Sequence, residues 1–409
     1  MSTDHHEGGS VQPPPPSDPP RAWLACILSF AALFVAFGLA YSYGVFFSPI
    51  THEFGARSGE GAAIFSITSL LFFGLSCITG PLSDRLGPRP LLLAAGVLIG
   101  AGLAGAAQAT ELWQAYVAYG LGVGLGASCV FVPVVAAVGR WFRRRRTTAL
   151  GIAVSGIGMG TLCVAPLSAW LIELHGWRTV YELYAIAAVL VLGLSGVLYP
   201  KPPRAPEGID DSRPRWGGRR YLHLYVATLG LNAVMYVPFV HLPPAAETLG
   251  IDPLRAAGLV GIIGVASVVG RLAIGPLGDR FPLLTLYRGC YAVIALSFLL
   301  WTVAGDYPGL ALFAVSLGVA YGGYIALTPA VLAHLFGLEN LGRLLGVLYT
   351  AVGLGASAGP LLTGLGVDLL GNYTVVLLVL HAVGLLSLLA TLPVRSGEAD
   401  GQPAAEQGH

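Results

Sequence analysis

The stretch Gly80-Pro-Leu-Ser-Asp-Arg-Leu-Gly87 recurs almost unchanged as Gly275-Pro-Leu-Gly-Asp-Arg280, at an offset of 195 residues. Each copy follows an apolar run and contains an aspartate followed by an arginine. The same offset relates further pairs along the chain: Tyr41 and Tyr236, Pro49 and Pro244, Gly151 and Gly346, Gly160 and Gly355, and Gly176 and Gly371. An internal repeat of this length predicts that the chain consists of two related halves.

The composition places both halves in a membrane. Hydrophobic residues make up 55% of the chain and charged residues 11%, with a mean hydropathy of +0.73, whereas a soluble enzyme of this length would need a larger charged surface. Hydropathy predicts about twelve spans, each near the ~20 apolar residues that cross the hydrocarbon core. The expected spans cover residues 22–49, 61–82, 90–108, 112–138, 148–172, 178–199, 221–248, 256–277, 283–304, 308–333, 343–367 and 373–394. We therefore predict an all-α membrane protein with twelve transmembrane helices in two pseudo-symmetric six-helix bundles.

Breaks in the hydropathy pattern divide the chain into five segments. The expected order is an N-terminal tail (1–20), a first bundle (21–199), a linker (200–220), a second bundle (221–394) and a C-terminal tail (395–409). The linker carries prolines and charges, and both tails have the composition of disordered segments. Lysine and arginine concentrate in the tails, the linker and alternate loops, which predicts that both termini are cytoplasmic in a plasma or inner membrane.

Arg271 is the most informative single residue, because it lies inside the apolar run 258–277. A guanidinium keeps its proton in a protein, so a charge at that depth is costly and usually marks a ligand pathway. The pattern predicts an anionic ligand. A structural role, in which the side chain donates hydrogen bonds to backbone carbonyls, is the alternative.

The motifs resemble a known family. Gly80 to Gly87, followed by Arg89, resembles the G-x-x-x-D-R-x-G signature between helices 2 and 3 of the major facilitator superfamily. Within that superfamily the chain resembles the branch of monocarboxylate transporters and oxalate/formate exchangers. This second resemblance rests on Tyr43 to Phe47 leading to Glu53 to Gly55, on Trp141-Phe142 with the arginine run before Gly151-Ile152-Ala153, and on Arg271. It implies the major facilitator fold, a carboxylate-binding role for Arg271, and proton symport.

Two departures from the family pattern bear on the mechanism. The segment 344–368 contains neither lysine nor arginine, although oxalate exchangers are expected to carry a second buried cation in helix 11. Ser267 stands one turn before Arg271, where animal members tend to carry an aspartate. One unpaired cation suits one carboxylate, and an empty carrier would turn over with an uncompensated charge, which favours anion exchange.

Counting residues from the helix ends places Ser155 and Thr350 near the depth of Arg271, with Asn232 and Tyr324 a turn deeper. The other predicted substrate contacts are Tyr321, Tyr119 and Tyr43, because a buried phenol needs a hydrogen-bond partner and can orient a substrate. Asp84, Arg85, Asp279 and Arg280 are expected to steady a cytoplasmic gate. His241 and His381 are candidate proton carriers, because histidine titrates near neutral pH, although a packing histidine explains either position as well.

The sequence predicts a secondary active transporter of small monocarboxylates of the lactate and pyruvate class, working by alternating access with proton coupling, and not an enzyme. An oxalate/formate-type anion exchanger and a drug or metabolite exporter remain as alternatives. The expected partners are a small carboxylate, protons and the lipid bilayer, with no nucleic acid and with function as a monomer. No cofactor or metal is expected, since the five cysteines form no close pair.

Overall fold

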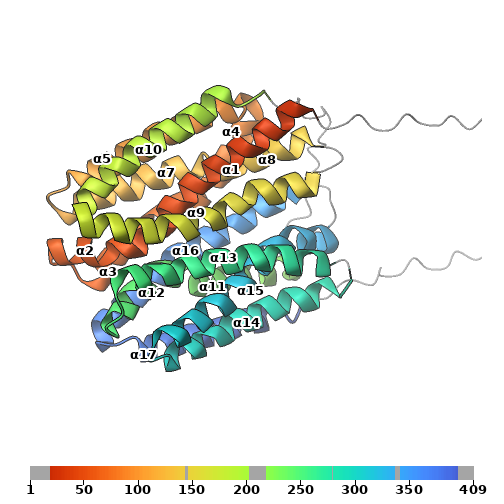
Figure 1. The fold of residues 1–409 in the computed structure, drawn as a ribbon. Coiled ribbons are helices and arrows are strands. Elements are labelled where there is room, and N and C mark those ends of the chain that lie inside the picture. The colour runs from red at the N-terminus through yellow and green to blue at the C-terminus, as the bar shows by residue number, and fades with distance from the viewer. Residues whose placement is uncertain (1–18, 143–145, 202–217, 279, 337–340, 395–409) are drawn as a thin grey trace, which may run out of the picture.

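The computed structural model describes residues 19–142, 146–201, 218–278, 280–336 and 341–394. Within these ranges the chain is almost entirely helical and contains no strand. Figure 1 shows the helices running roughly side by side in two bundles, one built from α1 to α10 and the other from α11 to α17.

Each bundle contains several long helices and some short ones. The first comprises α1 (Pro20–Tyr41), α2 (Tyr43–Phe54), α3 (Ser58–Gly74), α4 (Ser76–Leu86), α5 (Pro88–Ala107), α6 (Leu112–Ala115), the π-helix η1 (Tyr116–Leu121), α7 (Gly122–Ser128), α8 (Phe131–Trp141), α9 (Arg146–His175) and α10 (Trp177–Leu198). The second comprises α11 (Arg219–Met235), α12 (Pro238–Thr248), α13 (Pro253–Leu277), α14 (Leu283–Val303), α15 (Tyr307–Phe336), α16 (Leu341–Leu370) and α17 (Thr374–Ala390).

Eleven segments of the described chain are long and apolar enough to cross a membrane, and α17 is a shorter apolar helix of 17 residues. Several of these segments join two helices end to end, as α1 and α2 do over Pro20–Phe54. With α17 as the last element, this arrangement confirms the predicted class, which is an all-α membrane protein with twelve spans. The boundaries predicted for the five segments remain predictions, since most of the linker and both tails lie outside the described residues.

Four of the expected spans are interrupted helices. The breaks fall at Ser42, Leu75, Cys129-Val130 and Tyr236-Val237. At the last of these, Pro238 is the first residue of α12, a position where the missing N–H of proline is tolerated. Such interruptions are permitted inside a membrane protein when neighbouring groups satisfy the freed backbone. At Ser42, the side chain hydroxyl donates to the Leu39 carbonyl (2.9 Å).

The repeat is visible in how the helices pack. A Cβ atom placed on Gly160 would collide with the carbonyl oxygen of Phe34, and one placed on Gly355 would collide with that of Leu229. Both pairs are related by the offset found in the sequence. Glycine therefore allows α9 to touch α1, and α16 to touch α11, at equivalent places in the two bundles.

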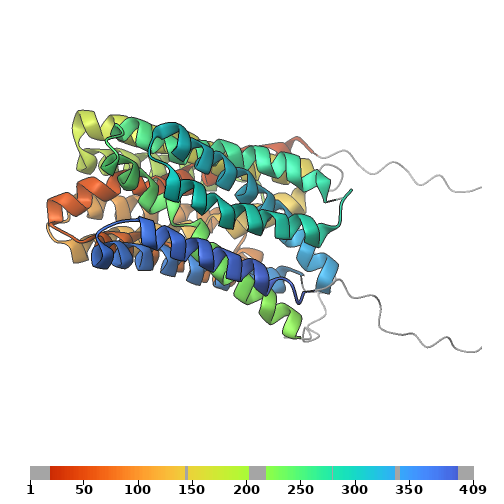
Figure 2. The ribbon, with the colours of Figure 1, turned by 90° about the horizontal axis from the view of Figure 1, so that it is seen from below.

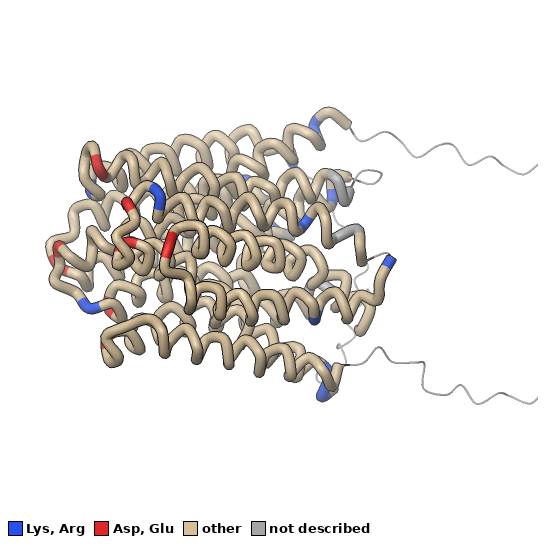
Figure 3. The backbone as a smooth tube through the Cα atoms, turned by 60° about the horizontal axis from the view of Figure 1, so that its bottom comes forward, with Lys and Arg blue, Asp and Glu red and all other residues tan. Residues whose placement is uncertain are grey.

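Charge is distributed unevenly between the two ends of the molecule. Figure 3 shows most lysines and arginines at the end where α1 begins, while the aspartates and glutamates gather at the opposite end. Figure 2 shows that α17 ends on the same side as α1 begins. An even number of crossings gives that arrangement.

Candidate functional site

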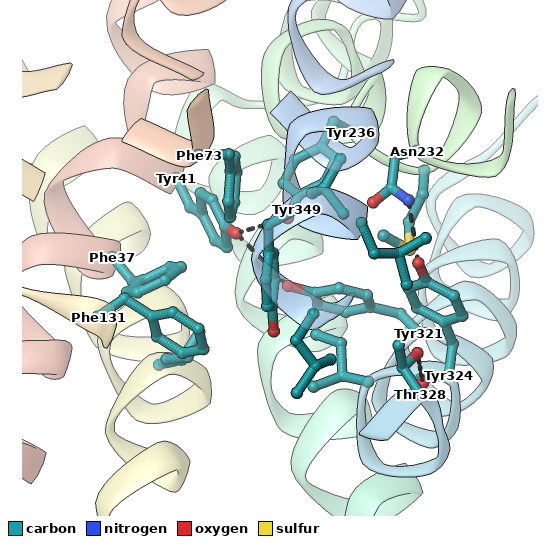
Figure 4. A pocket seen from close by; sticks show the side chains of 16 residues that line it. Phe37, Tyr41, Phe73, Phe131, Asn232, Tyr236, Tyr321, Tyr324, Thr328 and Tyr349 are labelled. Atoms are coloured by element: carbon teal, nitrogen blue, oxygen red, sulfur yellow. Dashed lines mark hydrogen bonds between the residues drawn. The ribbon is translucent and has the colours of Figure 1, made fainter. Parts of the chain in front are cut away.

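A cavity lies between the two bundles and has ≈ 40 Å³ open to water-sized molecules. By this measure one water needs about 10–15 Å³, so a small solute can fit. The lining residues are Phe37, Tyr41, Phe73, Phe131 and Ile157 from the first bundle, and Asn232, Met235, Tyr236, Tyr321, Tyr324, Ile325, Thr328, Leu345, Leu348, Tyr349 and Val352 from the second (Figure 4). Eight of the sixteen are aromatic, so the wall presents mainly ring faces and a few phenol hydroxyls.

Three tyrosines join the bundles across this cavity. The Tyr41 hydroxyl donates to the Tyr236 hydroxyl at 3.2 Å and lies 3.5 Å from that of Tyr321 (Figure 4). Tyr41 and Tyr236 are partners in the sequence repeat, so equivalent residues from the two halves meet at the interface. A buried phenol needs such a partner, and here the partner is another phenol that borders the cavity.

Asn232 is the amide side chain in the lining, and it is completely buried on α11. Its Nδ2 donates to the Thr228 carbonyl at 2.7 Å and to the Tyr324 hydroxyl at 3.1 Å. The first contact lies within α11 and the second reaches α15. Asn232 therefore connects two helices of the second bundle at the cavity wall.

Arg271 lies on α13 at the edge of this site and is not itself a lining residue. Its Cζ is 5.9 Å from the centre of the Tyr321 ring, which does line the cavity. Close contact between α13 and α15 brings the two together, because Gly322 packs against the backbone of Ser267 and Arg271.

The Arg271 guanidinium is only partly satisfied. Its Nη1 donates to the Val154 carbonyl of the opposite bundle at 3.1 Å. Its Nε and Nη2 are buried and have no hydrogen-bond partner among the described residues, and within the same ranges no carboxylate forms an ion pair with it. A buried cation with free donors is costly unless an anion completes it. This geometry can accept a carboxylate.

The remaining predicted contacts lie elsewhere. Tyr43 and Tyr119 pack against each other, with ring centres 5.5 Å apart, inside the first bundle. Their hydroxyls donate to the carbonyls of Gly61 (2.7 Å) and Leu39 (3.3 Å). None of these groups borders the cavity, so Asn232, Tyr321 and Tyr324 are the predicted side chains that the structure brings to its wall.

The two predicted hydroxyl residues also bond away from the cavity. The Ser155 hydroxyl donates to the Ile152 carbonyl of its own helix at 2.6 Å. That of Thr350 donates to the Val347 carbonyl at 2.7 Å and lies 3.0 Å from the Tyr225 hydroxyl. Neither residue lines the cavity.

Comparison with known proteins decides the family. A profile of the Major Facilitator Superfamily matches residues 28–309 and 222–409. Monocarboxylate transporter 13 of Rattus norvegicus is 31% identical over 393 residues, covering 92% of this chain and 90% of the relative. Monocarboxylate transporter 11 of Homo sapiens is 30% identical, covering 89% and 80% respectively. The chain belongs to the major facilitator superfamily, in its monocarboxylate transporter branch.

The fold of this transporter has solved counterparts. A bacterial homologue of the human lysosomal transporter Spinster, in an inward-facing and unoccupied conformation, superposes with a TM-score of 0.70 at 15% identity. The match covers 93% of this chain and 99% of that one. At this identity the likeness concerns the fold alone. Membership of the family makes the chain a multi-pass membrane transporter and not an enzyme.

The two histidines considered for proton transfer in this transporter are both hydrogen-bonded. His241 is buried on α12, with Nε2 2.9 Å from the Pro360 carbonyl and Nδ1 3.3 Å from the Tyr373 hydroxyl. A neutral ring satisfies both contacts, because Nε2 donates and Nδ1 accepts. Nδ1 of His381 on α17 donates to the Ala295 carbonyl of α14 at 2.8 Å, outside the cavity between the bundles.

The predicted gate of the transporter lies largely outside the described residues. Asp279 and the side chain of Asp84 belong to the part that is not described, while Arg85 and Arg280 are exposed. The expected role of these four residues remains a prediction.

The cavity wall includes residues beyond the predicted contacts. The repeat pairs two of them, Tyr41 and Tyr236, at the observed offset. Tyr349 carried no such signal, and it differs from the predicted Thr350 by a single position. Consecutive residues of a helix point in directions roughly 100° apart. Tyr349 therefore faces the cavity, while Thr350, the next residue, faces another helix.

Proposed function

We propose that this transporter carries small monocarboxylates of the lactate and pyruvate class, with Arg271 binding the carboxylate. The supporting observation is the pair of buried guanidinium donors beside the aromatic cavity, which have no partner in the part of the chain that the structure describes. A planar fork of donors can hold both oxygens of a carboxylate, and exclusion of water strengthens the contact. The name of the relatives, monocarboxylate transporter, supports the same substrate class.

The remainder of the substrate lies in the aromatic cavity in this proposal. The polar side chains of the second bundle there are Asn232, Tyr236, Tyr321, Tyr324, Thr328 and Tyr349. The position between the bundles suits alternating access, in which the halves rock about a central site. The gathering of arginines at the end where α1 begins supports a cytoplasmic location for that end, in a cell membrane.

The decisive experiment is uptake of radiolabelled lactate into proteoliposomes, comparing the intact protein with Arg271→Gln. Loss of saturable uptake in the variant, with normal folding, supports the proposal. Arg255→Gln is the matched control, because Arg255 is an exposed arginine at the other end of the same helix, where its Cζ lies 4.6 Å from the Tyr307 ring centre. Equal uptake by Arg271→Gln and the intact protein would remove Arg271 from the substrate site.

Coupling to protons is part of the proposal and rests on the family resemblance. An inward proton gradient should then stimulate uptake into vesicles that contain no other transported anion. The relatives are named monocarboxylate transporters, and a monocarboxylate carries a single negative charge. One proton bound with each anion would therefore make the cotransport electrically neutral.

Anion exchange is the second candidate, and one observation favours it. Among the described residues Arg271 has no carboxylate partner, so the empty carrier would have to reorient with an uncompensated charge. Exchange predicts that labelled lactate enters only when the vesicles hold an internal monocarboxylate, with or without a proton gradient. The same preparation therefore separates the two mechanisms.

A further inference from the structure

The orientation of the Asn232 amide is fixed by its neighbours. One of the two polar atoms lies 2.7 Å from the Thr228 carbonyl, which can only accept, so that atom must be the nitrogen. The same nitrogen donates to the Tyr324 hydroxyl. Oδ1 is therefore the other atom, and Figure 4 shows it turned away from Tyr324, towards the part of the cavity lined by Tyr236.

Oδ1 has no hydrogen-bond partner among the described residues, although Asn232 is completely buried. The Tyr41 hydroxyl donates to that of Tyr236, and the Thr328 hydroxyl donates to the Tyr324 carbonyl at 2.6 Å, so neither donates to Oδ1. A buried acceptor without a donor is unfavourable. The cavity thus presents a fixed acceptor that a ligand can satisfy.

We propose that Asn232 Oδ1 accepts a hydrogen bond from a substrate hydroxyl, an inference that rests on the proposed function. This contact makes the protein a transporter that prefers hydroxy-monocarboxylates. An oxo acid of the same carbon skeleton places a carbonyl oxygen there instead, so that two acceptors face each other. A site that hydrogen-bonds a substrate hydroxyl strongly rejects the analogue that lacks this hydroxyl. An apolar pocket discriminates much less between two substrates of similar shape. Asn232 is then the specificity-determining residue, while Arg271 holds the carboxylate that both kinds of acid share.

The test uses pairs of acids that differ in one group, namely lactate with pyruvate, 3-hydroxybutyrate with acetoacetate, and 3-phenyllactate with phenylpyruvate. Each acid competes against labelled lactate for entry into proteoliposomes. The preference should appear in at least one pair, the one in which the hydroxyl of the bound acid reaches Asn232. In that pair we expect the KM or inhibition constant of the hydroxy acid to be roughly 10-fold to 100-fold lower than that of the oxo acid. Ratios near one for all three pairs in the intact protein would overturn the proposal, since a water molecule would then satisfy Oδ1.

Asn232→Leu keeps a similar volume and removes the acceptor. We expect this variant to lose the preference, bringing the ratio close to one by weakening hydroxy-acid binding. Ser297→Ala is the matched control, because Ser297 is a buried polar residue of the same bundle whose hydroxyl bonds to the Ile294 carbonyl of its own helix (2.7 Å). A folded Asn232→Leu protein with an unchanged preference would refute the role of Asn232. Should it fail to fold, the ratios of the intact protein still decide.

The two proposals can fail separately. Uptake that depends on Arg271 but shows no preference between hydroxy and oxo acids would retain the monocarboxylate function and reject the role of Asn232. Uptake that survives Arg271→Gln would reject the proposed carboxylate site, whatever the preference.

Discussion

At the scale of single residues, the geometry of the Arg271 guanidinium distinguishes two ways of binding an anion. Nη1 is held by the Val154 carbonyl, which leaves Nε and Nη2 on the other edge of the planar group. Those two donors match the spacing of carboxylate oxygens. A lysine would keep the charge and lose the fork.

Arg271→Lys should therefore transport the same substrates with a KM raised about 10-fold, equivalent to ~1.4 kcal/mol. Initial rates of lactate uptake over a range of concentrations measure the change. Arg255→Lys, at the exposed start of α13, serves as the control and should leave KM unaltered. An Arg271→Lys carrier with the KM of the intact protein would show that charge suffices and that the carboxylate is not held by two hydrogen bonds.

How far the site could be predicted also depends on single residues. Arg271 is predicted as the site because it is the one charged residue in the run 258–277, a signal that needs no structure. Asn232, Tyr321 and Tyr324 are predicted contacts that do line the cavity. Tyr43, Tyr119, Ser155 and Thr350 have the right residue types, yet they hydrogen-bond to other groups. Depth follows from counting, whereas the direction of a side chain depends on how helices pack.

At the scale of the helices, the sequence predicted the spans and the repeat but not the breaks. Apolar length gives the number of crossings, and twelve were expected. The interruptions at Ser42 and Leu75 are not predicted, because neither residue is a strong helix breaker. The recurrence of glycines at the repeat offset carried more information, since Gly160 and Gly355 turned out to occupy equivalent helix contacts.

These contacts predict an asymmetry between two pairs of glycines. Gly160→Ala and Gly355→Ala each press a methyl group against a backbone carbonyl, and overpacking of this kind costs about 1–3 kcal/mol. We expect the apparent melting temperature in detergent to fall by about 2–4 °C for each. Gly151→Ala and Gly346→Ala, also partners in the repeat, place the added methyl group where no atom of the described residues lies within 4 Å, so both should be neutral or slightly stabilising. Equal shifts in both pairs would contradict close helix packing at residues 160 and 355.

At the scale of the whole molecule, the bundles are fastened to each other at the end opposite the start of α1. The Asp368 carboxylate of α16 accepts hydrogen bonds from the backbone N–H groups of Ser58 (2.9 Å) and Gly59 (2.8 Å), at the beginning of α3. Nearby, the Ser48 hydroxyl of α2 donates to Glu247 of α12 at 2.9 Å. A carboxylate at a helix N-terminus is favourable both as an acceptor and through the helix dipole. With α1 starting in the cytoplasm, as proposed, these contacts hold the outer side of the transporter closed.

Opening towards the outside must break the contact between Asp368 and α3, so Asp368→Asn should favour the outward-open state. The amide has no charge and keeps one acceptor oxygen in place of two, and a loss of about 1 kcal/mol raises the outward-open population roughly fivefold. Met235→Cys, which lies in the cavity wall, reports that state in a cysteine-free background through its rate of labelling by a membrane-impermeant maleimide added outside. Asp306→Asn is the control, because Asp306 accepts from the Gly309 N–H within its own helix end and bridges no bundles. Faster labelling with Asp368→Asn alone would show that this carboxylate helps to hold the outer side closed. Equal labelling rates in the reporter protein, in Asp368→Asn and in Asp306→Asn would contradict that role. Opening would then be limited by contacts deeper between the bundles, such as the Tyr41–Tyr236 pair.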